Sequence, residues 1–367
     1  MNTDKNRKMS PIINGALKRW GKSDVRDFLE GTMKLSDTQW LLSHLFEKIV
    51  SRRTVTDVLK QRETSKFVTP SAVDQRKLND FDNVAFSLLN SAYCCIELSP
   101  LAPLGSNSLL TKLSQGNLLP TTRMTEVVGD IAVSLAIESA AISRHQKVSN
   151  VKLATSHRIT RVQDFSSIPG FTQHFKMFGL STSGIGSSDS EDAIVEHIDF
   201  YLSLLEFLKT MWCDFTDLTV YISDISMSMK MIQTAGLSME EVRSMTDYEE
   251  EYDLCSKSKI NVERYHESLS SVSGVQYSAF AATAERIKRL QQEYSSVKIL
   301  YDLGRIAGIN YYNGLCFKIV ATNARGQTLP LADGGFSDWS AQLLHDKKRF
   351  CVTSGIGSEM FCREFGE

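Results

Sequence analysis

Three short stretches hold the residues whose types and order could do chemistry. They are DLGRIAGINYYNG at 302–314, ADGGFSD at 332–338 and GIGSE at 355–359. An arginine can form charge-assisted hydrogen bonds with phosphate or carboxylate, and such fixed cations offset negative charge that develops during a reaction. The tyrosines of the first stretch could face a ligand or could simply pack a sheet. The glycines of the other two are also compatible with turns and bulges.

The histidines and cysteines predict no metal site. No pair among the seven histidines has the spacing of a zinc protease, and none has a cysteine at a useful offset. The seven cysteines are odd in number and form no C-x-x-C pair, which argues against a disulfide framework or a zinc knuckle. We expect Cys94 and Cys95 to be small buried apolar residues; a cysteine–histidine nucleophile is the alternative.

Composition limits the function classes. The chain has 367 residues, 42% of them hydrophobic, so it should bury one large core or two modest ones. Lysines and arginines number 41 against 43 acidic residues, and the net charge of −2 excludes a strong field for non-specific nucleic-acid binding. No apolar stretch reaches the roughly 18 residues of a membrane span. These features predict a soluble, cytoplasmic protein.

Apolar spacing and turn residues predict the elements that must position the three stretches. We expect helices in 1–70, over 71–93, 126–144 and 193–211, strands at 94–98, 151–155, 175–180 and 219–222, a loop over 100–120, and antiparallel hairpins over 297–361. The polar, acidic segment after Gly236 predicts a helical insertion.

In this order, the three stretches resemble the end of the catalytic core of histidyl-tRNA synthetases. That family reads roughly D-L-x-x-x-R-G-L-D-Y-Y-x-G, A-G-G-R-Y-D and G-x-G-x-E-R. Upstream, IELSP at 96–100 is similar to motif 1 of class II synthetases, and His157-Arg158 followed by Glu191-Asp192-Ala193 is similar to motif 2 and its helix. The resemblance implies an α+β fold, a class II aminoacyl-tRNA synthetase-like antiparallel sheet of about six strands flanked by helices. It also implies a homodimer.

The resemblance divides the chain into four parts. We expect a helical N-terminal extension (1–70), a first core part (71–235), a helical insertion (236–290) and a second core part (291–367). No anticodon-binding domain is expected after the third motif, so tRNA is not an expected partner.

Several family positions carry different residues here. Ala307 stands where the family has an arginine, Met360 where the third motif has one, and Thr160 where the second motif has an acid. Each lost guanidinium removes charge-assisted hydrogen bonds of about 1.5–3 kcal/mol. The loss of two would slow adenylation by several powers of ten, since about 1.4 kcal/mol is tenfold.

The amino-acid pocket that the resemblance implies is better kept. Tyr311 and Tyr312 match its paired tyrosines, Arg158 matches the arginine of motif 2, and Arg305 shares a face with the missing arginine. Arg123 with Glu126 matches the L-R-P-E-G-T stretch, with Thr125 as the alternative acid position. The expected substrate-binding residues are therefore Arg123, Glu126, Arg158, Gln173, Arg305, Tyr311 and Tyr312, with no metal ligand and no assigned catalytic residue. Ser181 falls where the family has a glutamate for the imidazole.

Two main hypotheses for function follow from this resemblance. The first is a paralogue that does not charge tRNA and binds an amino acid or related metabolite as a regulatory or accessory subunit, as in ATP phosphoribosyltransferase, with a protein partner. The second is a repurposed amino-acid-activating ligase in which Arg158, Arg123 and Arg305 form a rearranged clamp. ATP and Mg²⁺ are expected only under the second. A scaffold without a ligand is a third reading, and no reading includes a membrane.

Overall fold

A computed structural model describes residues 35–162, 172–226, 286–302 and 311–366, together with residues 229, 283, 305 and 307–309. Contacts divide the chain into two units. The first comprises 1–63 with 121–124, and the second comprises 64–120 with 125–367. The predicted insertion over 236–290 lies almost entirely outside the described residues.

Residues 35–64, nearly all of which belong to the first unit, form two helices, in a part of the chain where the sequence predicts helices. Helix α3 spans Leu35–Val50 and helix α4 spans Val55–Thr64. The loop between them is closed by Asp57, whose carboxylate accepts hydrogen bonds from the backbone amide and the hydroxyl of Thr54, both at 2.8 Å.

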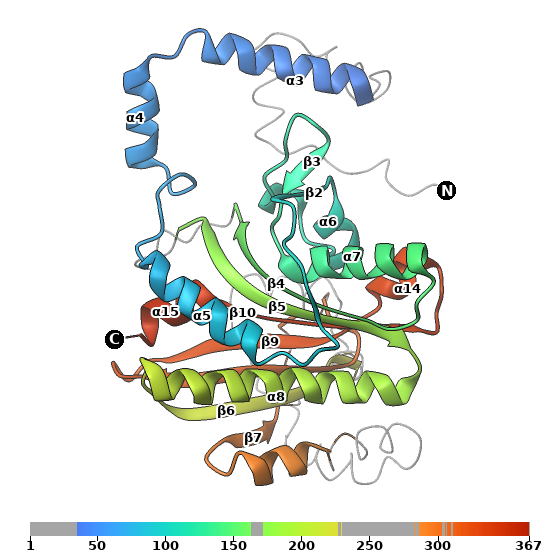
Figure 1. The fold of residues 1–367 in the computed structure, drawn as a ribbon. Coiled ribbons are helices and arrows are strands. Elements are labelled where there is room, and N and C mark those ends of the chain that lie inside the picture. The colour runs from blue at the N-terminus through green and yellow to red at the C-terminus, as the bar shows by residue number, and fades with distance from the viewer. Residues whose placement is uncertain are drawn as a thin grey trace. The chain divides into compact units, whose positions relative to one another are not determined.

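The second unit is built on an eight-stranded sheet (Figure 1). In spatial order, its strands are β1 (Cys94–Cys95), β4 (Val151–Thr160), β5 (His174–Ile185), β10 (Arg349–Ile356), β9 (Thr328–Ser337), β8 (Leu315–Asn323), β6 (Phe215–Asp224) and β7 (Lys298–Tyr301). The six central strands are antiparallel, and the short strands β1 and β7 pair in parallel at the two edges. These two edge strands account for the difference from the expected six.

Helices cover both faces of this sheet. Helices α5 (Gln75–Ser87), α8 (Ser187–Met211) and α15 (Ser358–Glu364) pack on one side, which we call the α8 face. Helices α7 (Ile131–Gln146) and α14 (Trp339–Leu344) pack on the other, the α7 face. Figure 1 shows α7 and α14 above strands β9 and β10, and α8 below these two strands.

Alternation along the strands decides which side chains reach each face. Even-numbered residues of β5 and β10, such as Phe178, Leu180 and Val352, point into the apolar core beneath α8. Phe178 stacks on Phe200 of α8, with ring centroids 5.6 Å apart. This face therefore holds the main core of the unit.

The α7 face is different in kind. The residues of β5, β9 and β10 that point this way include Ser181, Ser183, Asp333, Ser337 and Thr353, which are small or polar. Nearer the start of β5, Phe175 and Met177 point this way too and pack with Ile131 of α7. Cys351 points this way too and packs with Trp339 against α7. The candidate site lies on this face.

Residues 100–127 contain more structure than the sequence predicts. Instead of one loop, they form β2 (Leu101–Pro103), α6 (Ser106–Thr111), the 3₁₀ turn η1 (Gln115–Asn117) and β3 (Thr125–Val127). The predicted helix over 126–144 was also placed too early, because Asp130 caps it by accepting a hydrogen bond from the amide of Ala132 at 2.9 Å. Glu126 consequently belongs to a strand.

Two further expectations concern the surface. Cys94 and Cys95 are exposed, so the prediction that they are buried was wrong. The reason is that strand β1 lies at the edge of the sheet and has a neighbouring strand on one side only.

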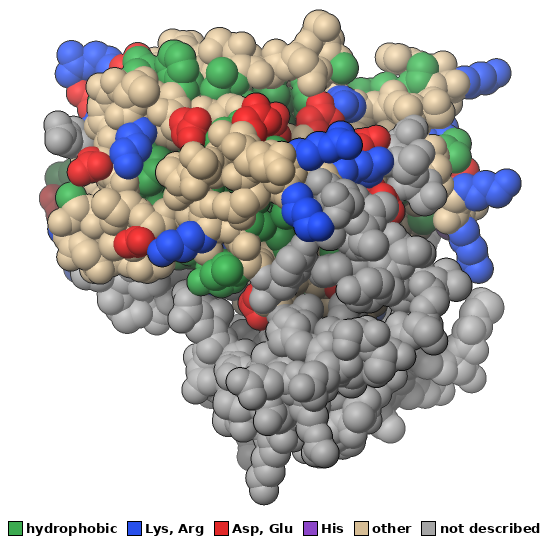
Figure 2. Space-filling model, turned by 90° about the horizontal axis from the view of Figure 1, so that it is seen from below, with side chains coloured by type: hydrophobic (Ala, Val, Ile, Leu, Met, Phe, Trp, Pro, Cys, Tyr) green, Lys and Arg blue, Asp and Glu red, His purple; other side chains and the backbone are tan. Residues whose placement is uncertain are grey.

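Acidic and basic side chains are interspersed over the described surface seen from below (Figure 2). No helix in the described part of the chain combines the length and the apolar composition that crossing a bilayer requires.

Candidate functional site

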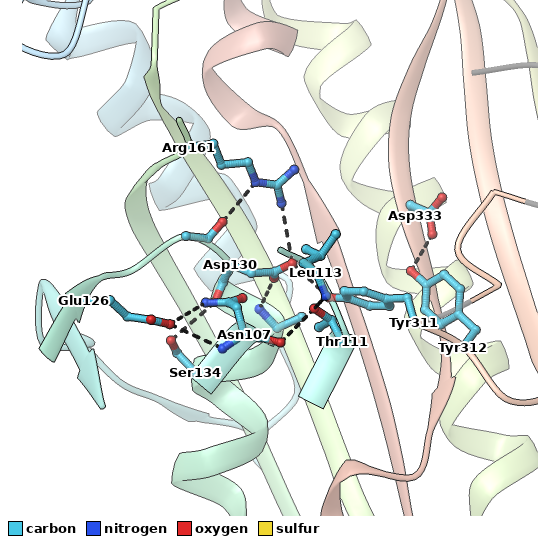
Figure 3. Close-up of polar contacts among 12 residues, drawn as sticks. Asn107, Thr111, Leu113, Glu126, Asp130, Ser134, Arg161, Tyr311, Tyr312 and Asp333 are labelled. Atoms are coloured by element: carbon cyan, nitrogen blue, oxygen red, sulfur yellow. Dashed lines mark hydrogen bonds and ion pairs between the residues drawn. The ribbon is translucent and has the colours of Figure 1, made fainter. Parts of the chain in front are cut away.

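The paired tyrosines lie at the centre of a hydrogen-bonded group on the α7 face (Figure 3). The hydroxyl of Tyr312 donates to Asp333 of β9 at 2.5 Å, and that of Tyr311 donates to Asp130 at 3.1 Å. The Tyr311 ring meets those of Tyr312 and Trp339 edge-on, at centroid distances of 4.8 and 4.7 Å. The tyrosines therefore connect strand β9 with the start of helix α7.

Arg305 completes one end of this group. Its guanidinium bonds Asp333 through Nη2 at 2.6 Å and the carbonyl of Ala307 through Nε at 3.0 Å, and it lies over the Tyr312 ring. The Arg305 side chain is only 5% exposed, whereas that of Asp333 is 43% exposed. Nη1 of Arg305 is buried and has no hydrogen-bond partner among the described residues. The arginine is thus fixed in place with one donor unused.

Asp130 and Arg161 form the other end. Asp130 caps α7 through one carboxylate oxygen, and its second oxygen lies 3.4 Å from Nη2 of Arg161. Arg161 also donates to the carbonyl of Gly129 at 3.0 Å and packs over Phe175. Its side chain remains 31% exposed. A cation is therefore held beside an acid at a helix N-terminus.

Burial and the neighbouring carboxylates keep both tyrosines neutral. Burial raises the pKa of Tyr311 well above its usual range, and Asp130 adds to the shift. Burial likewise raises the pKa of Tyr312, with Asp333 adding to the effect. Both hydroxyls therefore keep their protons near neutral pH. They act as hydrogen-bond donors and cannot serve as bases.

Arg158 does not join this group. It is an even-numbered residue of β4, on the same side as Ser156, which bonds Asp82 of α5. Its Nη1 lies 2.7 Å from Glu359 of α15 and 2.9 Å from Nδ1 of His174. The structure thus places Arg158 on the α8 face. The neighbouring residue His157 faces α7, and its buried Nε2 has no hydrogen-bond partner among the described residues.

The other expected binding residues have separate surroundings. Glu126 is fully buried, and its carboxylate accepts hydrogen bonds from the amides of Gly105 and Asn107 and from the side chains of Asn107 and Gln115, at 2.8 to 3.3 Å. Gln173 precedes β5, where its carbonyl accepts from the amide of Arg161. Arg123 is exposed and belongs to the first unit. Of the seven expected residues, the structure brings together Arg305, Tyr311 and Tyr312.

Ser181 has a partner of its own. It is fully buried on β5, and its hydroxyl lies 3.3 Å from that of Ser139 in α7.

Sequence reasoning missed three members of the group: Asp130, Arg161 and Asp333. Asp130 had a local signal, because an aspartate directly before an apolar helical run is a typical N-cap. Asp333 was part of the second stretch but received no role. Arg161 lies just beyond the end of β4, where strand alternation no longer tells its direction, so the sequence offered no comparable signal.

The described residues offer little for a metal or a nucleotide. They contain no group of three or more His, Cys, Asp or Glu side chains arranged to hold a metal ion. Met360, at the position of an expected arginine, packs against the apolar core, and Ala307 offers only its carbonyl. The donor set at these two positions does not fit the phosphates of ATP.

Comparison with solved structures identifies the fold. A histidyl-tRNA synthetase or ATP phosphoribosyltransferase regulatory subunit from Bacillus halodurans superposes with a TM-score of 0.57 at 16% identity, over 78% of this chain and 79% of its own. Histidyl-tRNA synthetase from a Nostoc species gives 0.54 at 16% identity, over 80% and 73%. The chain has a class II synthetase-like fold.

A third similar structure comes from a complex. The ATP phosphoribosyltransferase HisG:HisZ complex from Thermotoga maritima contains a chain with a TM-score of 0.50 and 15% identity, covering 80% of this chain and 98% of that one. No family model and no curated protein sequence matches the chain. At these sequence identities, the similarity to class II synthetase-like structures is a similarity of fold.

Proposed function

We propose that this chain is a histidyl-tRNA synthetase-like paralogue that does not charge tRNA and binds an amino acid or related metabolite as a regulatory or accessory subunit. One observation carries the proposal. The tyrosine pair is held on the α7 face with Asp333, Arg305 and Asp130, while the positions expected to clamp phosphates are apolar or face the opposite side. The site keeps groups that recognise a small zwitterion and lacks those that stabilise a transferring phosphate.

ATP–pyrophosphate exchange tests the loss of activation. Purified protein receives the twenty common amino acids in pools, with a control that contains no amino acid. We expect no exchange above the control with any pool. Exchange that depends on one pool would contradict the proposal and identify an activating enzyme.

Isothermal titration calorimetry with the same amino acids tests binding directly. We expect at least one amino acid to bind, and Tyr312→Phe to weaken that binding, because Asp333 then loses one of its two partners. Thr216→Val, at an exposed position of β6 away from the tyrosine pair, is the control and should leave binding unchanged. Absence of binding by every amino acid would contradict the proposal.

One observation favours the second candidate, an amino-acid-activating ligase. Arg161 presents a partly exposed cation beside Asp130, where the reacting groups of a substrate could meet it. Under this reading Arg161→Ala abolishes pyrophosphate exchange, and Arg158→Ala, which changes the opposite face, does not. If the wild-type protein shows no exchange, this candidate is rejected.

An accessory role also requires a second chain. The similar Thermotoga structure is a complex, which supports a protein partner here, and the resemblance to synthetases supports a homodimer. Light scattering after size exclusion should give the mass of two chains, about 82 kDa from the 41.1 kDa of one. A monomer at micromolar concentration would contradict the homodimer.

A further inference from the structure

The register of the sheet sets two rows of side chains side by side on the α7 face. In the first row, Asp333 lies between Lys318 of β8 and Gly355, which pairs with Gly179. The second row is two residues further along each strand and runs through Ser181, Thr353, Gly335, Cys316 and Ser223. Two residues of a strand span roughly 7 Å. A group bound at the first row therefore lies about 7 Å from the second.

The first row carries opposite charges around Asp333, which lies beside Lys318 of β8 and forms an ion pair with Arg305. Arg305 is more than nine-tenths buried, and its Nη1 has no partner among the described residues. A buried donor on a cation calls for a negatively charged acceptor, and a carboxylate is the natural one. Asp333 is 43% exposed and can accept from an ammonium group in turn. The two together fit the carboxylate and ammonium groups of an α-amino acid.

The second row offers only neutral groups. It contains no acidic, basic or imidazole side chain, and burial raises the pKa of the Cys316 thiol to about 12, so the thiol is uncharged. The hydroxyl of Thr353 is fully buried and has no partner among the described residues. A charged side chain placed here would lose its hydration without gaining an opposite charge. A hydroxyl or amide would instead supply the missing hydrogen bond.

From these two rows we infer that the ligand is an α-amino acid with a short, uncharged, hydrogen-bonding side chain, which Thr353 recognises. This inference rests on the proposed function and adds the class of ligand. It assigns Arg305 to the carboxylate and Thr353 to the side chain. Serine, threonine, asparagine and glutamine belong to the class, whereas histidine, lysine, arginine, aspartate and glutamate do not.

Calorimetric titration of the wild-type protein with each of the twenty amino acids is the first test. We expect members of the class to bind at least about tenfold more tightly than charged amino acids, histidine or leucine, a difference of about 1.4 kcal/mol. Preference for a charged, aromatic or apolar amino acid overturns the inference and leaves the proposed function standing. No binding by any amino acid overturns the proposed function itself.

Variants at Thr353 then test the assigned contact. Thr353→Val keeps the shape and removes the hydroxyl, so it should weaken the preferred ligand roughly tenfold and leave alanine binding unchanged. Thr353→Ser keeps the hydroxyl and should retain the preference. Thr216→Val, on the exposed start of β6, is the matched control. If Thr353→Val keeps the preference, the role assigned to Thr353 is overturned. If Thr353→Val does not fold, Thr353→Ser takes its place, and loss of the preference in Thr353→Ser overturns that role.

Discussion

The α8 face and the α7 face of the central sheet are built from the same strands but present opposite kinds of side chain. On the α8 face, Phe178, Phe317 and Val352 lie fully buried in one continuous apolar cluster. On the α7 face, strands β5, β10 and β9 carry Ser181, Thr353 and Asp333. A residue's position along a strand, odd or even, therefore decides whether its side chain joins the large apolar cluster under α8 or points to the α7 face.

The largest expected effect comes from removing a large side chain from the apolar core on the α8 face. Phe178→Ala should lower the free energy of unfolding by about 3–5 kcal/mol, because it removes a buried ring that contacts Phe86 and Phe200. Urea unfolding measures the change. Phe207→Ala, at a half-exposed position of α8, is the control and should change stability by only about 0.5 kcal/mol. Similar losses in the two variants would contradict the assignment of the core.

Acid should weaken the α8 face through His197. This histidine is fully buried between Thr182 and Ser354, and burial lowers its pKa to about 3 from the usual 6.5. The unfolded chain binds the proton first as the pH falls below 6.5, so the native state loses stability from there down towards pH 3. At about 1.4 kcal/mol per pH unit, the loss between pH 7 and 5 is roughly 2 kcal/mol.

Unfolding curves between pH 7 and 5 check this effect. His197→Gln should flatten the slope, whatever it does to stability at pH 7. His345→Asn, at an exposed position with a left-handed backbone, should retain the wild-type slope. A slope that His197→Gln leaves unchanged would mean that another group controls the pH response.

Arg158→Ala sharpens the comparison because the family resemblance and the structure assign Arg158 to different faces. We expect a loss of stability of about 1 kcal/mol, since solvent screens this partly exposed cation and Glu359 keeps Ser71 and the amide of Lys176 as donors. Amino-acid binding should not change. A tenfold loss of binding with intact folding would instead place Arg158 at the ligand.

The smallest expected effect on stability lies at the centre of the α7 face. Thr353→Val replaces a buried hydroxyl that has no partner in the described part of the chain with a methyl group of similar volume, so stability should change by less than about 0.5 kcal/mol or rise slightly. Thermal unfolding without ligand measures it. A loss above 2 kcal/mol would show that Thr353 supports the fold rather than the ligand.

The sequence was most informative where apolar spacing is long and regular. Helix α8 and strands β4 and β5 follow the predicted pattern, although each runs several residues beyond it. Residues 100–120 were predicted as a loop because serine, asparagine, glycine and proline dominate them. Their short elements are held by a buried carboxylate, Glu126, whose partners are 11 to 21 residues away in sequence. Composition does not encode such contacts.

The site shows a similar limit. The tyrosine pair was identified from its neighbours in sequence, but its partner Asp130 is 181 residues away. The face of Arg158 depends on strand register, and a shift of one residue reverses it. Matching Arg158 to a family motif identified the residue but could not tell to which face of the sheet its side chain points. Side-chain direction at a strand requires the packing partner to be known, here Asp82 and Glu359.

A chain of hydrogen bonds crosses the otherwise apolar core under α8. It runs from Tyr93 to Thr182, through both nitrogens of His197 to Ser354, and on to Tyr201. Thr182 and Ser354 belong to neighbouring strands, so His197 can satisfy both only when β5 and β10 are aligned as they are here. A slip of two residues between these strands would keep the side-chain faces but take one of the two partners away from the imidazole. This chain of hydrogen bonds thus favours one alignment of β5 and β10 during folding, whereas burial of the apolar side chains alone would allow several alignments.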